Sequence, residues 1–275
     1  MWDRIEPLMP ADPVRGRRWD DHRRTLEAIA WKYRTNSPWR DLPDELGSFQ
    51  TAHKRLIRWA VDGTWEMILA AVLAAADADD DIDWTVSVDS TVVRAHQHAA
   101  GALKRGAHCG EPADHALGRS RSGLSTKVHL AADGRARPLA FTVTAGQAGD
   151  APAFETVMSR IRVPRTGPGR PRTRPLAVLA DRAYSSRAIR AHLRRRGIRA
   201  VIPQPSDQVG HRLRRGRLGG RPPGFGNEAY KQRISVERCI NRLKQWRGLA
   251  TRTDKLAIAY QAALHLAGIL IWTRR

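Results

Sequence analysis

From residue 84 onward, short β-branched and apolar segments alternate with amphipathic ones in an order that is compatible with few folds. Three strand-like segments come first, followed by a helix, a strand, a helix, a strand and a last charged helix. We expect strands at 84–93, 125–133, 137–146, 176–181 and 198–203, and helices at 151–162, 185–197 and 230–244. Asp133 and Gly134 predict a hairpin turn between the second and third strands, and Asp150 is placed to cap the first helix. The order therefore predicts an α/β fold.

The first 80 residues have a different pattern. Helical periodicity is broken there by Pro and Gly, with segments around 20–33, 48–61 and 64–76 and no strand-like run. The acidic run from Asp77 to Asp83 has the composition of a linker. We therefore expect a small all-α domain over residues 1–80 and a larger α/β domain over residues 84–275.

Two aspartates stand in strands of the larger domain. Asp89 lies in its first strand, and Asp181 ends its fourth. Neighbouring strands bring such carboxylates into one crevice, where the last helix can add Glu237. Clustered carboxylates repel each other unless hard cations bind, and oxygen ligands suit Mg²⁺ or Mn²⁺. Two such ions would support phosphodiester displacement, although each aspartate taken alone fits a turn or a cap equally well.

The last helix carries a tightly spaced polar set. At about 100° per residue, Tyr230, Arg233, Glu237 and Lys244 fall within about 60° of one another around a helix. An apolar face lies beside them, so an ordinary amphipathic helix with a solvated side is the better explanation of the segment taken alone. Two strand-borne acids elsewhere in the chain favour the functional interpretation.

The charge of the chain points to a polyanion. The formal net charge is +21, and the segment from Arg160 to Arg221 holds 18 Arg and only two acids, Asp181 and Asp207. A solvated charged face normally mixes both signs, so this segment favours phosphate contact. Residues 210–226 are too rich in Gly, Pro and Arg to fold alone, which indicates a flexible insertion near 205–228 that orders on DNA, or simple disorder.

Other partners are disfavoured. The first 24 residues lack the apolar core of a secretory signal, and the apolar run 256–272 is short, interrupted and better suited to a buried helix than to a membrane. We therefore expect a cytoplasmic, nucleoid-associated protein with no membrane partner. A zinc site is conceivable in one crowded segment, but its spacing matches no standard pattern, and a loop beside the acids is favoured. The residues in question are His96, His98, His108, Cys109 and His115.

Four segments together resemble one family. They are SVDSTVVRAHQHAAG around Asp89, GRSRSGLSTKVHLAADGRARPLAF with TAGQAGD after it, LADRAYSSRAIRAHLRRRGIRAVIP around Asp181, and a Y-x2-R-x3-E-x6-K signature over 230–244. The N-terminal YRTNSPWRDLP and DGTWEMIL are also similar. The chain thus resembles the DDE transposases of bacterial insertion sequences, specifically the insertion sequence five group of the ribonuclease-H-like superfamily. That resemblance covers nearly the whole chain.

The resemblance implies a ribonuclease-H-like mixed sheet flanked by helices, with the helical domain recognising DNA ends. It implies that Asp89, Asp181 and Glu237 are catalytic and bind two Mg²⁺ ions, which Mn²⁺ can replace. Arg233 and Lys244 are then the bases that contact DNA phosphates, and Tyr230 packs beside the DNA backbone. The implied reaction is Mg-dependent cleavage of double-stranded DNA at terminal inverted repeats, followed by strand transfer into target DNA. Joining two ends implies a homodimer in the DNA complex.

Two other functions fit parts of the pattern. A non-catalytic DNA-binding protein, either a domesticated transposase or a repressor, would share the charge but has no reason to keep three carboxylates near phosphate. A structure-selective nuclease would share the acids but has no need of an end-recognition domain. The sequence does not specify the terminal repeat, the target site or the route of second-strand cleavage.

Overall fold

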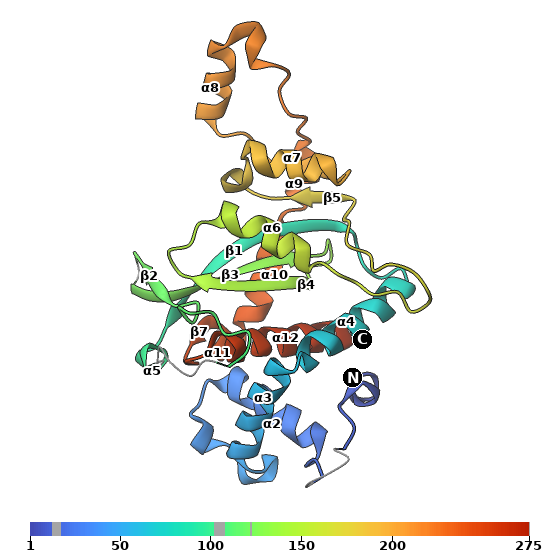
Figure 1. Ribbon diagram of the computed structural model, residues 1–275, viewed down its shortest axis with the longest axis vertical. Coiled ribbons are helices and arrows are strands. Elements are labelled where there is room, and N and C mark those ends of the chain that lie inside the picture. The colour runs from blue at the N-terminus through green and yellow to red at the C-terminus, as the bar shows by residue number, and fades with distance from the viewer. Residues whose placement is uncertain (13–17, 102–107, 122, 275) are drawn as a thin grey trace.

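The structure is a computed structural model that describes residues 1–12, 18–101, 108–121 and 123–274. Ser122, which belongs to the GRSRSGLSTK segment, lies outside these ranges. Figure 1 shows a twisted central sheet with a helical part below it in the view and a narrow helical arm above it.

The first part of the chain is helical, as the sequence predicts. Its α-helices are α1 (Trp2–Ile5), α2 (His22–Thr35), α3 (Phe49–Val61) and α4 (Thr64–Ala78), joined by short 3₁₀ turns η1 (Glu6–Leu8), η2 (Trp39–Asp41) and η3 (Asp44–Leu46). Asp21 caps α2, because its carboxylate accepts from the backbone N–H groups of Arg23 and Arg24. The helix ends at Asn36, whose left-handed backbone is one that asparagine tolerates.

The rest of the chain builds the sheet and its covering helices. The strands are β1 (Thr85–Ala95), β2 (Gly118–Ser120), β3 (Gly123–Ala132), β4 (Pro138–Ala145), β5 (Ala177–Leu179), β6 (Arg199–Val201) and β7 (Thr251–Arg252). The helices and 3₁₀ turns are α5 (Gln97–Ala100), α6 (Asp150–Arg160), η4 (Arg182–Tyr184), α7 (Arg187–Arg195), α8 (Ser206–Arg214), η5 (Gly216–Gly219), α9 (Asn227–Lys231), α10 (Ile234–Lys244), α11 (Arg247–Ala250) and α12 (Ala257–Thr273).

The sheet is mixed. Strands β1, β3 and β4 form an antiparallel meander, while β5 and β6 add to the other edge of β1 in parallel. The short β2 extends the meander beside β3, and β7 pairs with the far end of β1. An antiparallel meander followed by two parallel strands is the ribonuclease-H-like arrangement, so the predicted fold class is confirmed.

Helices cover both faces of the sheet. Because successive side chains of a strand point to opposite faces, the odd-numbered residues of β1 face α10 and the even-numbered residues face α6. Ser87, for example, bonds to Ser235 of α10, whereas Ser90 bonds to Asp150 of α6. Helix α12 packs on the same face as α10, against Phe141 of β4. Strand β1 therefore contacts α10 with one face and α6 with the other.

Helix α12 lies at the centre of the molecule. It is buried along nearly its whole length, packing against α2, α3 and α4 on one side and the sheet on the other. The apolar run 256–272 is thus a core helix, as predicted. Within the described residues, no single helix is long and apolar enough to cross a membrane, while α3 and α4 together pass that test only as a pair bent by 71°.

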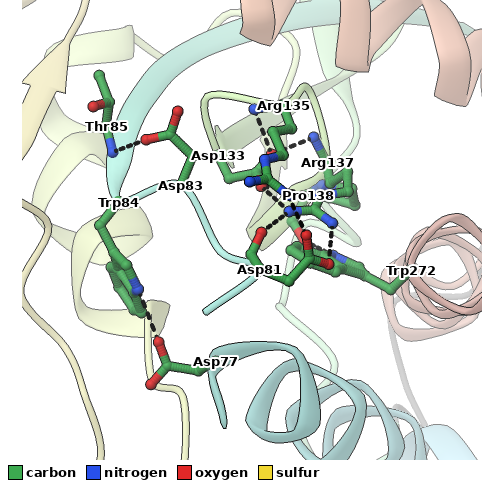
Figure 2. Close-up of polar contacts among 10 residues, drawn as sticks. All are labelled: Asp77, Asp81, Asp83, Trp84, Thr85, Asp133, Arg135, Arg137, Pro138 and Trp272. Carbon is green, nitrogen blue, oxygen red and sulfur yellow. Dashed lines mark hydrogen bonds and ion pairs between the residues drawn. The ribbon is translucent and has the colours of Figure 1, made fainter. Parts of the chain in front are cut away.

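The acidic run 77–83 is not the exposed linker that its composition suggests. Figure 2 shows Asp81 facing Arg135 and Arg137, and Asp77 facing Trp84. Asp81 is only 5% exposed, and its Oδ2 lies 2.7 Å from Nη1 of Arg137. Asp81 thus pairs with arginines of the β3–β4 connection, Asp77 pairs with Arg172, and Asp79 and Asp80 remain exposed.

That connection is also wider than the predicted Asp-Gly turn. Asp133 accepts hydrogen bonds from Arg135 and Arg137 across the loop, and the left-handed residue is Ala136 rather than Gly134. Arg137 in turn lies over the ring of Trp272, 3.8 Å from its centroid, so the loop is held to α12 as well.

The segment 205–228 forms the arm seen in Figure 1. It contains α8 and η5, and its side chains are largely exposed, including Leu213 and Leu218. The sequence predicts a flexible insertion here, and its behaviour on DNA stays a prediction.

Candidate active site

The two predicted aspartates lie at the same level of the sheet. Strands β1 and β5 are parallel neighbours, with Ser87 opposite Leu179 as their last pair. Asp89 and Asp181 each stand two residues beyond that pair, where the two strands separate. Both acids therefore lie near the carboxyl end of β5, which is the neighbourhood that the strand order predicts.

Asp181 is fixed by its own backbone. It immediately precedes η4, and its Oδ1 accepts from the backbone N–H of Ala183 at 2.9 Å. Asp89 is held differently, because its Oδ1 accepts from the backbone N–H of Ser90 at 2.7 Å. Both carboxylates thus keep one oxygen atom for a partner outside their local backbone.

Arg233 brings Glu237 to the same place. Its Nη1 lies 3.0 Å from Oδ2 of Asp89, and its Nη2 donates to Oε1 of Glu237. One guanidinium thus bridges an acid of β1 and an acid of α10. Its planar fork is suited to such a double contact, so Asp89 and Glu237 are held together by one arginine.

The electrostatics indicate crowded negative charge. Burial raises the pKa of Asp89, and the nearby charge of Asp181 pushes in the same direction, while Ser90 and Arg233 oppose the rise. Glu237 is the most exposed of the three acids, with about half of its side chain accessible. Asp89 is therefore a partly buried carboxylate whose charged form is disfavoured, which is a situation that a cation would relieve.

Helix α10 is preceded by a break. The sequence predicts one continuous helix from Tyr230 to Lys244, whereas α9 ends at Lys231 and α10 begins at Ile234. Tyr230 consequently packs beneath the start of α10, against the small apolar cluster of β5 and β6, with its ring 5.3 Å from that of Phe225. The guanidinium carbon of Arg233 is 5.9 Å from the Tyr230 ring.

Lys244 closes the other end of α10. Its Nζ lies 2.6 Å from Oγ1 of Thr91, on the same face of β1 as Asp89 and two residues beyond it. Burial lowers the pKa of Lys244. Arg233 and Lys244 therefore lie on either side of Glu237 and contact the same strand. Polar side chains at both ends of α10 thus lie along β1.

The histidine-rich segment does not form a metal centre in the described part of the chain. His115 is buried and bonds to Glu111, whose carboxylate also accepts from the first N–H groups of α12. His96 and His98 contact each other edge to face at the surface, and Cys109 is exposed. No group of three or more His, Cys, Asp or Glu among the described residues is arranged to hold an ion. Among the three predicted acids, Asp89 and Glu237 are separated by the guanidinium of Arg233, which bonds both of them.

The sequence does not single out a second polar cluster on the opposite face of β1. Asp150 does not cap α6 with its side chain, because its Oδ1 lies 2.6 Å from the Ser90 hydroxyl and 3.1 Å from Nζ of Lys127. Tyr184, three residues after Asp181, is buried beside this group. Two features of the sequence indicate this cluster. Asp150 ends the TAGQAGD segment, and the alternation of side chains along β1 places Ser90 toward α6.

Two family models match the chain. Residues 81–272 match the model described as a transposase DDE domain, and residues 1–69 match a putative transposase of the IS4/5 family. The first of these models spans well over half of the chain, and it includes all three acids.

Individual relatives agree. The chain is 39% identical over 105 residues to the uncharacterised protein y4sN of Sinorhizobium fredii, covering 38% of this chain and 79% of that protein. It is 28% identical over 151 residues to a putative transposase for insertion sequence element IS6501 of Brucella ovis, covering 55% and 100%. A solved Mos1 transposase paired-end complex aligns over 93% of this chain and 86% of that chain, with 12% identity and a TM-score of 0.25. That likeness is too weak to add weight, and on the family models the chain belongs to the DDE transposases of insertion sequence elements.

Proposed function

We propose that the protein cleaves double-stranded DNA at the ends of its mobile element and joins the freed 3′ ends to target DNA. The observation that carries the proposal is the single guanidinium of Arg233 between Asp89 and Glu237, with Asp181 at the same level of the sheet. The proposal is supported by these acids on three separate elements, two of them joined through Arg233, in a chain of net charge +21.

The acids suit divalent cations. All three offer oxygen ligands only, and the pKa of Asp89 is raised by burial and by Asp181, so the crevice has unbalanced negative charge. Asp89, Asp181 and Glu237 would hold two Mg²⁺ ions, or Mn²⁺ in their place. Bound there, the ions would activate a water or a 3′-hydroxyl and stabilise the leaving oxygen.

The neighbouring side chains bind and orient the substrate. Arg233 exchanges its carboxylate partners for a DNA phosphate, and Lys244 contacts a second phosphate further along β1. Tyr230 supports Arg233 from beneath and packs beside the DNA backbone. Cleavage and joining are both in-line displacements, so one set of residues serves both steps in turn.

The assembly follows from the reaction. Joining two ends requires at least two copies, so we infer a homodimer on DNA. The helical residues 1–80 select the terminal repeats, residues 84–275 carry the chemistry, and the flexible arm near 205–228 orders on DNA. The protein acts in the cytoplasm, on nucleoid DNA.

Cleavage of a supercoiled plasmid that carries the element with its flanking repeats tests the proposal. With Mg²⁺, the protein should cut at the repeats and leave 3′-hydroxyls, which primer extension can map. The variants Asp89→Asn, Asp181→Asn and Glu237→Gln should lose cleavage and keep DNA binding. Asp207→Asn, which removes a remote acid of the basic segment, should cut normally. Binding without cleavage by the unaltered protein would favour the non-catalytic alternative.

A further inference from the structure

Ser90 is bonded to acids on both sides of the sheet. Its backbone N–H donates to Oδ1 of Asp89 at 2.7 Å, and its hydroxyl donates to Oδ1 of Asp150 at 2.6 Å. Asp89 faces α10, whereas Asp150 belongs to α6 on the opposite face. One residue thus connects a proposed catalytic carboxylate to a carboxylate that has no assigned role.

Asp150 is itself firmly held. Lys127 donates to Asp150 at 3.1 Å and to the backbone carbonyl of Ala148 at 2.6 Å. Although burial works in the opposite direction, the Ser90 hydroxyl and the Lys127 ammonium keep the pKa of Asp150 below its ordinary value. Asp150 is therefore an ionised acceptor with a fixed position, which makes it a strong partner for the Ser90 hydroxyl.

The Tyr184 hydroxyl is close enough to Asp150, Asp89 and Asp181 for all three charges to act on it. Burial raises the pKa of its hydroxyl, and the charges of Asp150, Asp89 and Asp181 raise it further, in that order. Within the described residues its hydroxyl makes no hydrogen bond of ordinary geometry, although the Ser90 hydroxyl lies nearby. A neutral phenol next to three carboxylates fills the space between the two faces without adding charge.

We propose that Asp150 is a positioning residue of the acidic site, acting through Ser90 on the orientation of the Asp89 carboxylate. One set of bonds joins Lys127, Asp150 and the Ser90 hydroxyl, and a second joins the Ser90 backbone N–H, Asp89, Arg233 and Glu237. The two sets form one chain because the bond of the Ser90 side chain to Asp150 helps to hold the backbone that carries the N–H. This inference rests on the proposed function, because it gives Asp89 a ligand role.

The physical reason is rotational freedom. A carboxylate on a strand can turn about its last side-chain bond unless a fixed donor holds one oxygen. The Ser90 N–H supplies that donor for Oδ1, which leaves Oδ2 directed toward Arg233. Partners that orient a ligand in this way are typically worth about 10- to 100-fold in metal affinity or activity.

Two measurements test the role in the full-length protein. The first is the affinity for Mn²⁺ alone, followed by the electron paramagnetic resonance signal of the free ion. The second is the rate of Mn²⁺-dependent nicking of supercoiled plasmid. Ser90→Ala and Asp150→Ala should each weaken Mn²⁺ binding by about tenfold or more and slow nicking, with plasmid affinity unchanged. The double variant should be no worse than either single one, because both break the same chain.

Two further variants separate positioning from general damage. Asp150→Asn keeps an oxygen for the Ser90 hydroxyl and should bind Mn²⁺ within about threefold of the unaltered protein, well short of the loss expected on breaking the chain. Thr144→Val removes a hydroxyl that bonds His129 on the same face but outside the chain, and should change neither measurement.

Unchanged Mn²⁺ affinity in Ser90→Ala would overturn the inference, even if Asp150→Ala failed to fold. Additive losses in the double variant would also overturn it. Asp89→Asn tells the two proposals apart. If Asp89→Asn abolishes Mn²⁺ binding while Ser90→Ala does not affect it, only the positioning role fails. If Asp89→Asn binds Mn²⁺ normally, the acidic site itself is wrongly assigned.

Discussion

Arg233 and Asp89 form an ion pair of 3.0 Å although 144 residues separate them in the chain. The same guanidinium also pairs with Glu237, so two of the three proposed ligands already have a cationic partner. A divalent ion and Arg233 therefore compete for the same oxygens in the DNA-free protein. A DNA phosphate would draw Arg233 away, which would couple DNA binding to metal binding, and such coupling is reciprocal.

This competition makes a direct prediction for Arg233→Gln. Removing the guanidinium releases a charge-assisted hydrogen bond of about 1.5–3 kcal/mol, so Mn²⁺ should bind the DNA-free variant about tenfold more tightly or better. Titration calorimetry with Mn²⁺ would measure the change. Arg238→Gln is the matched control, since it removes the same charge from an exposed position of α10. Equal or weaker Mn²⁺ binding in Arg233→Gln would rule the competition out.

Lys244 should contribute one phosphate contact. Replacing it with Ala should lower DNA affinity and reduce the slope of log affinity against log salt by about 0.9, the value for one phosphate on duplex DNA. Fluorescence anisotropy with a labelled duplex at several salt concentrations measures this slope. Lys255→Ala, which removes an exposed lysine at the start of α12, should leave it unaltered. A slope that stays the same in Lys244→Ala would mean that Lys244 only anchors α10 to Thr91.

The buried ion pairs of Figure 2 predict a large difference between two neighbouring arginines. Arg137 is 8% exposed and bonds Asp81 and Asp133, both buried. Arg137→Met leaves Asp133 without its ion-pair partner and Asp81 with only the exposed Arg135, and should lower the free energy of unfolding by roughly 3–5 kcal/mol. Arg135 also contacts Asp81 but is exposed, so Arg135→Met should cost about 1 kcal/mol or less. Urea unfolding of both variants measures the contrast, and equal costs would contradict it.

Two buried histidines predict loss of stability in acid. Burial lowers the pKa of His129 to about 4 and that of His265 to about 3. Below about pH 6.5 the unfolded chain binds protons at both rings while the folded chain does not, so the free energy of unfolding falls as the pH is lowered toward 4. The expected slope is about 1.4 kcal/mol per pH unit for each histidine.

Urea unfolding between pH 7 and 4 measures that slope. His265→Leu should lower the slope by about 1.4 kcal/mol per pH unit, because a leucine binds no proton in either state. The exposed His98→Gln is the control and should keep the full slope. An unchanged slope in His265→Leu would show that the ring is protonated equally in both states.

Sequence periodicity is sufficient for much of the sheet. The strands around Asp89 and Asp181 could be placed because β-branched runs with period two are distinctive and because turn residues bound them. The break between Tyr230 and Glu237 could not, since Gln232 and Arg233 are good helix formers, and the break depends on how Tyr230 packs on β5 and β6. Local patterns do not report such tertiary effects.

The misread residues have a common cause. Asp81 and Asp150 were interpreted from their local setting, as part of a linker and as a helix cap, because short-range rules favour those roles for aspartate. Their actual partners, Arg137 and Ser90, are 56 and 60 residues away. A carboxylate fits its local role and its distant role equally well in a single sequence, and only the fold decides between them.

The central position of α12 has a consequence for synthesis. The ribosome makes this helix after the elements that it separates. About 180 residues are synthesised between the end of α4 and the start of α12, whose apolar surface packs against α3 and α4. Until α12 emerges, the helical part and the inner face of the sheet both expose hydrophobic side chains. An element copy that has acquired a premature stop codon upstream of α12 would therefore yield a protein prone to aggregate, rather than a stable fragment that competes with the intact one for DNA.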